Sequence, residues 1–354
     1  SPGYLNGTGT IAKFNKPWGI IIDSQGNLFV TEAANNTIRK ITPSGVVTTF
    51  AGSTSPGFIN GNGSTARFHM PYGICIDPGD TLYVVDRGNN AIRKITPSGN
   101  VSTIAGTGSS GFTNGPALTA KFDSPQGIRM DHYGKLYIAD RDNHAIRTLF
   151  NGVVSTLAGT GISGYVDTIA SLAQFDGPHG IAIDSAGFVY IGDSENNVIR
   201  RIDTNGLVGT YAGTGVAGYL DGPAASAQFK LTKGIVLNRY ETDIFICDRG
   251  NNRIRRLNFR QPLGINNNNT IFHSSVYPIP ASEIINIELK LNGNPRNIYL
   301  SLADITGRII YSDLLFSVDD LNAYEINVNP LESGVYFLNI MGKDFRISKK
   351  ILKQ

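Results

Sequence analysis

A short segment recurs five times along the chain at nearly constant spacing. Four copies contain paired Asn residues before Ile and Arg, as in NNTIRKI, NNAIRKI and NNRIRRL, and the third copy, NHAIRTL, has His in place of the second Asn. The arginines of these segments are separated by 54, 54, 53 and 55 residues and are Arg39, Arg93, Arg147, Arg200 and Arg255. A period this regular indicates an architecture that grows by repeating one structural unit.

Each period contains four short apolar runs separated by turn residues. In the second copy these runs are YGICID (72–77), TLYVVD (81–86), AIRKIT (91–96) and VSTIAG (101–106). TPSG places Pro and Gly where a type I turn prefers them, and Asp86 with the following Asn pair favours an Asx-type turn. Four short strands joined by tight turns form one antiparallel sheet, and such sheets repeated about an axis form a β-propeller. The sequence therefore predicts an all-β fold.

The repeat resembles the NHL-repeat family. The resemblance rests on PYGICID with LYVVD and NNAIRKI, and on PQGIRMD with LYIAD and NHAIRTL, and it covers residues 1–258. It implies an NHL-type β-propeller of five recognisable four-stranded modules, in a family whose rings are commonly six-bladed. The fifth module lacks its outer strand. SPGYLNG at the N-terminus matches SPGFING, which follows such a strand in another copy, so we expect that residues before Ser1 were lost by truncation or removed by processing. The blade number and the closure of the last blade stay open.

Charge and hydropathy exclude some partners. The net charge is +3 and no basic tail or block is present, so nucleic-acid binding is not indicated. No apolar run approaches the ~20 residues of a membrane span. The N-terminus does not have the pattern of a signal peptide. Cys75 and Cys247 each lie in an apolar, strand-like run, and we expect two buried, unpaired thiols.

One position varies inside an otherwise fixed frame. It lies between Pro and Gly at the start of each first strand, except that Thr232 replaces the Pro in the fifth copy. Its occupants are Trp18, Tyr72, Gln126, His179 and Lys233. First strands are innermost in a propeller blade, so these side chains should form a ring at the mouth of the central channel. Such a ring can stack on and hydrogen-bond a polar ligand or a glycan. The alternative, solvated edge residues without a ligand, stays open.

A second variable position follows the acid that ends each second strand. Its occupants are Ala33, Arg87, Arg141, Ser194 and Arg249. The three arginines could hold a carboxylate or a phosphate, or could pair with neighbouring acids. The invariant Ile-Arg arginines are instead expected to pair with the acids Glu32, Asp86, Asp140, Asp193 and Asp248. Aromatic side chains at a fixed repeat position, expected to fill the space between blades, are Phe68, Phe122, Phe175 and Phe229.

After a linker at 259–275 the pattern changes to longer alternating runs, which predict a β-sandwich of immunoglobulin type over 276–354. VYPIPASEIINIEL, ADITGRIIYS, LESGVYFLNI and KKILKQ resemble, in order, the C-terminal sorting domain of type IX secretion substrates in Bacteroidota. Ile279 stands where the family usually has Asn. The residues that the resemblance assigns to the secretion signal are Pro278, Pro280, Ala281, Ser282, Gly307, Arg308, Gly334, Lys349, Lys350 and Lys353.

The sorting domain implies transit through the periplasm of a Gram-negative bacterium and release or attachment at the cell surface. We therefore expect a secreted or surface propeller that binds a glycan, peptide or protein without catalysis, with no cofactor and no metal. One alternative is a lyase or hydrolase with a metal near the channel, because His69 and His179 could both reach its mouth. Against it, the histidines do not share one repeat position. Another alternative is a structural matrix or spacer component.

Overall fold

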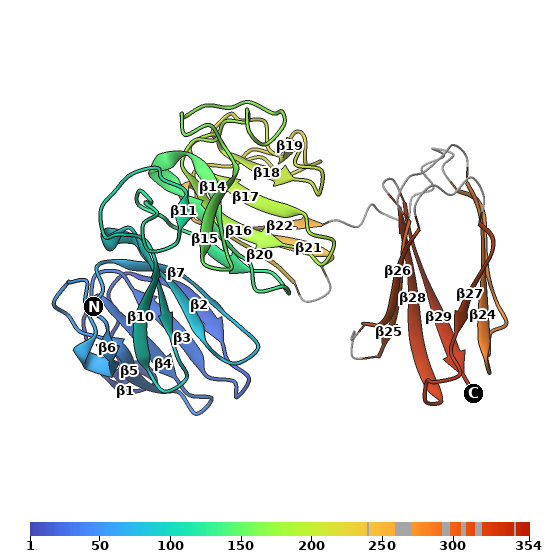
Figure 1. The fold of residues 1–354 in the computed structure, drawn as a ribbon, viewed down its shortest axis with the longest axis horizontal. Coiled ribbons are helices and arrows are strands. Elements are labelled where there is room, and N and C mark those ends of the chain that lie inside the picture. The colour runs from blue at the N-terminus through green and yellow to red at the C-terminus, as the bar shows by residue number, and fades with distance from the viewer. Residues whose placement is uncertain (239–240, 259–270, 292–297, 306–308, 316–320, 343–344) are drawn as a thin grey trace. The chain divides into compact units, whose positions relative to one another are not determined.

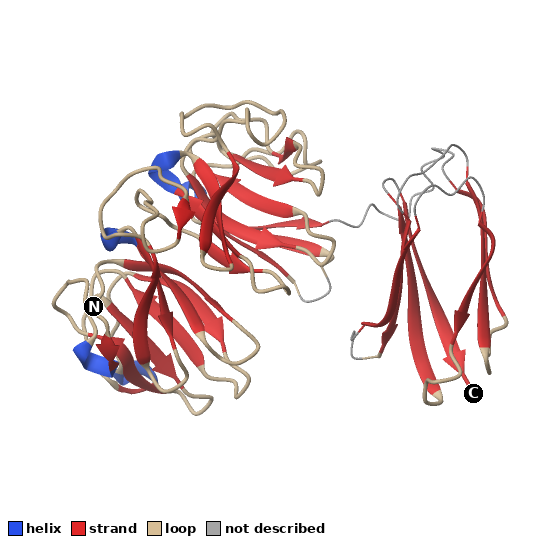
Figure 2. Cartoon of the chain, in the orientation of Figure 1, coloured by secondary structure: helices blue, strands red, loops and turns tan. Residues whose placement is uncertain are grey.

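The computed structural model describes residues 1–238, 241–258, 271–291, 298–305, 309–315, 321–342 and 345–354. The chain separates into two compact units, Ser1–Arg260 and Gln261–Gln354. Across the described ranges nearly all regular structure is strand, and helix is confined to short 3-10 turns (Figure 2). Most of the predicted linker at 259–275 lies outside the described residues, but β23 (Ile271–Tyr277) begins inside it, so its last part is strand.

The described part of the first unit contains five antiparallel sheets that follow one another along the chain, called blades 1 to 5 (Figure 1). In blades 1 to 3 four main strands follow one another from the inside of the ring to the outside. A two-residue strand from the loop that precedes each blade pairs with its fourth, outermost main strand. Blade 1 consists of β1 (Gly7–Thr8), β2 (Pro17–Ile22), β3 (Leu28–Glu32), β4 (Thr37–Ile41) and β5 (Val46–Gly52). Blade 2 consists of β6 (Gly61–Asn62), β7 (Pro71–Ile76), β8 (Leu82–Asp86), β9 (Ala91–Ile95) and β10 (Asn100–Ala105).

The remaining blades lose strands towards the end of the unit. Blade 3 consists of β11 (Gly115–Pro116), β12 (Ile128–Met130), β13 (Leu136–Asp140), β14 (Ala145–Phe150) and β15 (Val153–Ala158). Blade 4 consists of β16 (Pro178–Ile183), β17 (Val189–Asp193), β18 (Val198–Ile202) and β19 (Val208–Ala212). Blade 5 has three described strands, β20 (Thr232–Leu237), β21 (Asp243–Asp248) and β22 (Arg253–Asn258). Residues 259–270 lie outside the described part of the chain, so the missing outer strand of this blade stays a prediction.

First strands of successive blades lie side by side. β7 contacts both β2 and β12, and β16 contacts both β12 and β20. The first strand of each blade is therefore the innermost, as predicted, and the residues that begin these strands share one end of the channel.

Each frame arginine forms a buried ion pair with the acid that ends the preceding strand, as predicted. The N–O distances lie between 2.6 Å and 2.9 Å, and the pairs are Arg39–Glu32, Arg93–Asp86, Arg147–Asp140, Arg200–Asp193 and Arg255–Asp248. The other oxygen of each acid accepts a backbone N–H from the residue after the loop aromatic, for example His69 at 2.8 Å from Asp86. Burial raises the pKa of Asp86 to about 6, so the pair is ionic at pH 7.

The same arginines hold the loops between blades. Arg93 donates to the carbonyls of Arg67 and Ile59 at 3.0 Å and 2.9 Å, and its guanidinium lies between the rings of Phe58 and Phe68, 5.1 Å and 5.0 Å away. Arg147 repeats this arrangement in blade 3. Desolvated cation–π contacts are worth about 2 kcal/mol each. The predicted aromatic plugs are fully buried or nearly so, and are Phe68, Phe122, Phe175 and Phe229.

The paired Asn residues have separate tasks. Asn89 donates to Asp86 at 2.8 Å inside its own blade. Asn90 adopts a left-handed conformation (φ 47°), and its Oδ1 accepts the N–H of Ser124 in the lead to the next blade, at 2.8 Å. The segment between the second and third strands is thus a structural corner rather than an ion-binding loop.

The outward faces of blades 1 and 5 are apolar and exposed. Ile20 of blade 1 is 59% exposed, whereas its counterpart Ile74 in blade 2 is 6% exposed. On blade 5, Phe245 is 37% exposed and Cys247 is also exposed, so the prediction of two buried thiols is wrong for Cys247. No further blade covers that face within the described residues. Cys75 is buried between blades, which raises its thiol pKa to about 12.

The second unit contains two antiparallel sheets. One has the order β23, β24 (Ile284–Leu291), β27 (Leu321–Asn327), and the other has the order β26 (Ile309–Leu315), β25 (Ile298–Asp304), β28 (Gly334–Gly342), β29 (Phe345–Lys353). Ile287 of the first sheet and Leu302 and Leu338 of the second belong to one buried core. The unit is therefore a sandwich of two sheets, and its immunoglobulin type stays a prediction.

Loss of a frame arginine should destabilise the propeller far more than loss of its neighbour. Arg200→Met leaves the buried carboxylate of Asp193 without its ion-pair partner and should cost about 3 to 5 kcal/mol of unfolding free energy. Arg201→Met, one residue on, removes contacts with the rings of Phe188 and Tyr211 and should cost about 1 kcal/mol. Urea unfolding followed by the fluorescence of Trp18, the single tryptophan, measures both values. Equal losses would contradict the role assigned to the buried pair.

Candidate functional site at the channel mouth

The variable residues that begin the inner strands come together at one end of the channel. Trp18 stacks on Tyr72 with ring centroids 4.3 Å apart and planes inclined by 23°. Trp18 also lies 5.4 Å from the ring of His179, which belongs to blade 4. Side chains from blades 1, 2 and 4 thus meet. We call the set Trp18, Tyr72, Gln126, His179 and Lys233 the channel mouth.

The glycines after the first four variable residues allow this approach. An added β-carbon at Gly127 would lie 2.1 Å from the carbonyl oxygen of His179, and one at Gly180 would lie 2.3 Å from that of Lys233. Backbones this close exclude any side chain. The Pro-x-Gly pattern therefore sets the spacing of the inner strands and presents the residue between Pro and Gly to the mouth.

The mouth combines buried polar groups with one exposed ring. Gln126 is 2% exposed and His179 is 4% exposed, whereas Trp18 is 39% exposed. Burial holds the pKa of His179 well below its usual range, and Lys233 and the three rim arginines act in the same direction, so His179 is neutral at pH 7. Burial also lowers the pKa of Lys233 to about 8, although the nearby Glu195 opposes this shift. Lys233 therefore keeps its charge at pH 7.

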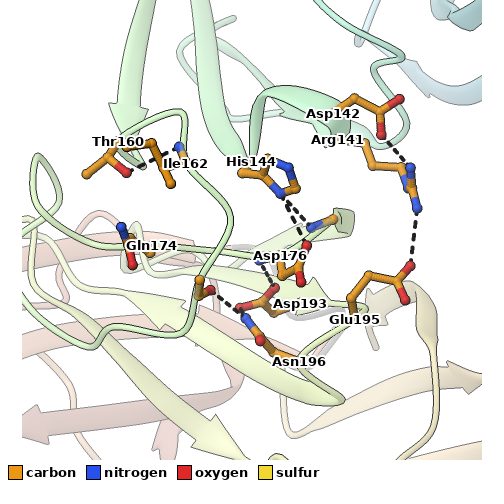
Figure 3. A network of polar contacts seen from close by, with 12 residues as sticks. Arg141, Asp142, His144, Thr160, Ile162, Gln174, Asp176, Asp193, Glu195 and Asn196 are labelled. Carbon is orange, nitrogen blue, oxygen red and sulfur yellow. Dashed lines mark hydrogen bonds and ion pairs between the residues drawn. The ribbon is translucent and has the colours of Figure 1, made fainter.

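The predicted rim arginines, Arg87, Arg141 and Arg249, differ in their partners. Arg141 contacts Asp142 and lies 3.2 Å from Glu195, which follows Ser194 on the next blade (Figure 3). Arg87 places its guanidinium 5.0 Å from the centre of the Tyr72 ring. Neither Arg87 nor Arg249 forms an ion pair with any residue that the structure describes. At the two remaining rim positions, Ala33 and Ser194 are buried.

Sequence reasoning missed Glu195. Other copies have Ala34, Gly88, Asp142 and Gly250 at its position. The repeated frame therefore does not require an acid there, and the presence of Glu195 could have indicated a functional residue. The structure makes Glu195 a counter-ion of Arg141 and an electrostatic neighbour of Lys233. It also missed Ser194 as a buried hydroxyl whose Oγ has no hydrogen-bond partner in the described chain.

The histidines do not form a metal centre in the described part of the chain. His144 replaces the second Asn of the frame and accepts the N–H of Gly177 at 3.2 Å, next to Asp176 (Figure 3). His69 packs against Gly88, where an added β-carbon would lie 2.5 Å from its ring. Within the described residues no group of three or more His, Cys, Asp or Glu side chains is placed to hold a metal ion.

Two parts of the predicted secretion signal meet in the second unit. The N–H of Ala281 donates to Leu352 at 2.8 Å and the carbonyl of Ala281 accepts from Gln354 at 3.0 Å, so the PIPAS segment runs parallel to the C-terminal strand. Gly334 pairs with Lys353 on the other side of that strand. Pro278, Pro280, Ser282, Lys349 and Lys350 are exposed. Gly307 and Arg308 lie outside the described residues.

Comparison with known families agrees with both halves of the chain. The family model described as a secretion system C-terminal sorting domain matches residues 275–354, and the NHL repeat model matches residues 68–95 and 175–202. The chain therefore carries NHL repeats followed by a type IX secretion sorting domain. That domain directs export to the cell surface or the extracellular space. No helix among the described residues is long and apolar enough to cross a membrane.

Curated relatives share only part of their length with this chain. Protein SUPPRESSOR OF QUENCHING 1, chloroplastic, of Arabidopsis thaliana is 26% identical over 95% of this chain, which spans 32% of that protein. NHL repeat-containing protein 2 of Bos taurus is 32% identical over 39% of this chain and is matched over 21% of its own length.

Solved structures show the same propeller fold. An auxiliary nutrient binding protein from Bacteroides thetaiotaomicron is 19% identical with a TM-score of 0.56, covering 69% of this chain and 59% of that one. A second such protein, from Bacteroides ovatus, is 18% identical with a TM-score of 0.53, covering 68% and 58%.

Adding one methyl group between inner strands should disturb the mouth. Gly127→Ala must displace the carbonyl of His179 and should cost about 1 to 3 kcal/mol of unfolding free energy. Gly209→Ala in β19 has open space around the new methyl group and should leave stability within about 1 kcal/mol of the parent. Thermal unfolding compares the two. A neutral Gly127→Ala would contradict the close approach of blades 3 and 4.

Removing the C-terminal strand residues 349–354 should abolish export. The truncation deletes both backbone partners of Ala281 and part of the buried core at Ile351. Cell fractionation of a host with type IX secretion should show the truncated chain retained in the periplasm. Lys349→Ser with Lys350→Ser, which changes only exposed side chains, separates a need for the lysines from a need for the fold. Normal export of the truncated chain would contradict the assigned signal.

Proposed function

We propose that this exported propeller is a non-enzymatic binding module that recognises a glycan, peptide or protein ligand at the channel mouth. The observation that carries the proposal is the combination found there. The exposed indole of Trp18 lies beside the buried His179 and stacks on Tyr72. Tyr72 in turn contacts Arg87, which has no ion-pair partner in the described residues. Aromatic surface with a few convergent polar groups is typical of ligand sites.

The chemistry of the mouth favours binding over catalysis. His179 is held neutral by burial and by the surrounding cations, which suits a hydrogen bond to a ligand better than proton transfer near pH 7. The similarity in fold to proteins described as auxiliary nutrient binding proteins supports a binding role at the cell surface. The second partner of the chain is the secretion machinery, which binds the sorting domain. We propose residues 276–354 as the bounds of that domain.

Substitution at the mouth should abolish ligand binding without unfolding the propeller. Trp18→Ala removes the exposed ring and its stacking on Tyr72, a loss of about 1 kcal/mol of stability. A screen of the full chain on glycan and peptide arrays should yield a ligand that this variant no longer retains.

The matched control is Tyr133→Ala. Tyr133 is 74% exposed and lies in the turn between β12 and β13, at the opposite end of the inner strand that begins beside Gln126. This variant should retain the ligand. A ligand that Trp18→Ala binds as tightly as the parent chain, or the absence of any ligand on both arrays, would overturn the proposal.

A further inference from the structure

Positive charge converges on the mouth from three blades. Arg87, Arg141, Lys233 and Arg249 all act electrostatically on His179, although they come from blades 2, 3 and 5. Asp142 and Glu195 neutralise Arg141. Asp123 lies close enough to Arg87 for the two charges to interact, but the two form no ion pair. Glu195 acts electrostatically on Lys233 but already pairs with Arg141, and Arg249 forms no ion pair with any described residue. The cations of the described mouth are therefore only partly compensated, which favours an anionic group beside Lys233 and Arg249.

Hydrogen-bonding capacity at the mouth is also unused. The Oε1 atom of Gln126 is buried and has no hydrogen-bond partner among the described residues, and the Oγ atom of Ser194 is in the same situation. Buried polar atoms without a partner are rare, because each destabilises the fold. An amide oxygen accepts only, so its missing partner must be a donor such as a hydroxyl group.

One aromatic ring of the channel mouth, that of Trp18, is open to a ligand. Tyr72 is covered by Trp18 and approached by the guanidinium of Arg87. Trp18 keeps 39% of its surface exposed and is the ring that a ligand can reach. A flat apolar face, such as the C–H face of a sugar ring, can pack on an indole while its hydroxyl groups point to polar neighbours.

We propose that the channel mouth binds an acidic saccharide, with the sugar ring against Trp18, a hydroxyl donated to Gln126 and the anionic group held by Lys233 and Arg249. The inference rests on the proposed function and names the ligand class of the same site. A peptide carboxylate would satisfy the cations, but only an acidic sugar carries the anionic group, a flat C–H face and several hydroxyl donors on one ring. The acid of the saccharide is a carboxylate or a sulfate, which share this chemistry.

The test titrates the full chain with defined oligosaccharides and follows the fluorescence of Trp18. The probes are oligomers of galacturonate, glucuronate and mannuronate, their methyl esters, and a sulfated galactan. The esters keep every ring and hydroxyl but lose the charge. At least one acidic oligomer should bind about tenfold to a hundredfold more tightly than its uncharged counterpart, as expected for the loss of charge-assisted hydrogen bonds. Preference for the galactan over all uronates would assign the sulfate.

Variants separate the charge from the fold. Arg249→Gln should weaken binding of the acidic oligomer about tenfold and leave binding of its ester unchanged. The control Arg253→Gln changes an exposed arginine of the same blade and should have no effect. Affinity should also fall as the pH rises through about 8, where Lys233 loses its proton, because its pKa in the fold lies below its usual value. Lys233→Met should remove that pH dependence.

Failures of the two proposals are distinguishable. If the methyl esters bind as tightly as the acids, or if only peptides bind at the mouth, the acidic-saccharide inference is wrong while the binding function stands. If no saccharide or peptide binds and Trp18 fluorescence never responds, the binding function itself fails.

Discussion

The buried pair between a frame arginine and the acid of the preceding strand is the interaction on which the propeller depends. Each arginine closes its own blade through the acid, binds two carbonyls of the loop that leads into the blade, and lies between two aromatic rings of that loop. One side chain thus joins strand, turn and loop. A charge removed from water is costly unless all its neighbours compensate it, so the surrounding residues must recur with the arginine.

Because the frame fixes the backbone, the residues that the frame leaves free can serve a ligand. The glycines beside the mouth residues of blades 1 to 4 bring neighbouring inner strands so close that the variable side chains must share one small space. Trp18 and His179 meet across the channel for this reason, although they lie in blades 1 and 4. Burial, together with four cations that act in the same direction, holds the pKa of His179 well below its usual range and leaves it neutral. Within each repeat, the conserved frame residues set the backbone geometry, and the variable residue beside them sets the chemistry of the mouth.

Much of this arrangement can be predicted from the sequence, because residues that recur at the same position of every repeat are easily recognised. The five arginine–acid pairs, the buried loop aromatics and the innermost first strands all follow from positions that recur. Cys247 shows where the pattern misleads. Its apolar neighbours indicate burial, but burial requires a covering blade, and none lies over that face of blade 5 in the described chain. Glu195 escaped notice because a residue found in only one copy has no pattern to identify it.

The sequence by itself determined the all-β fold, the blade frame and the sorting domain, since each rests on local turn chemistry, strand periodicity or an ordered set of motifs. Only the tertiary structure decided which mouth residues touch, which arginines are neutralised and which polar atoms are left without a protein partner. It also brought Ala281 beside the C-terminal strand, about seventy residues away along the chain. Charge compensation and burial depend on distances between segments that are remote in sequence, and those distances exist only in the folded chain.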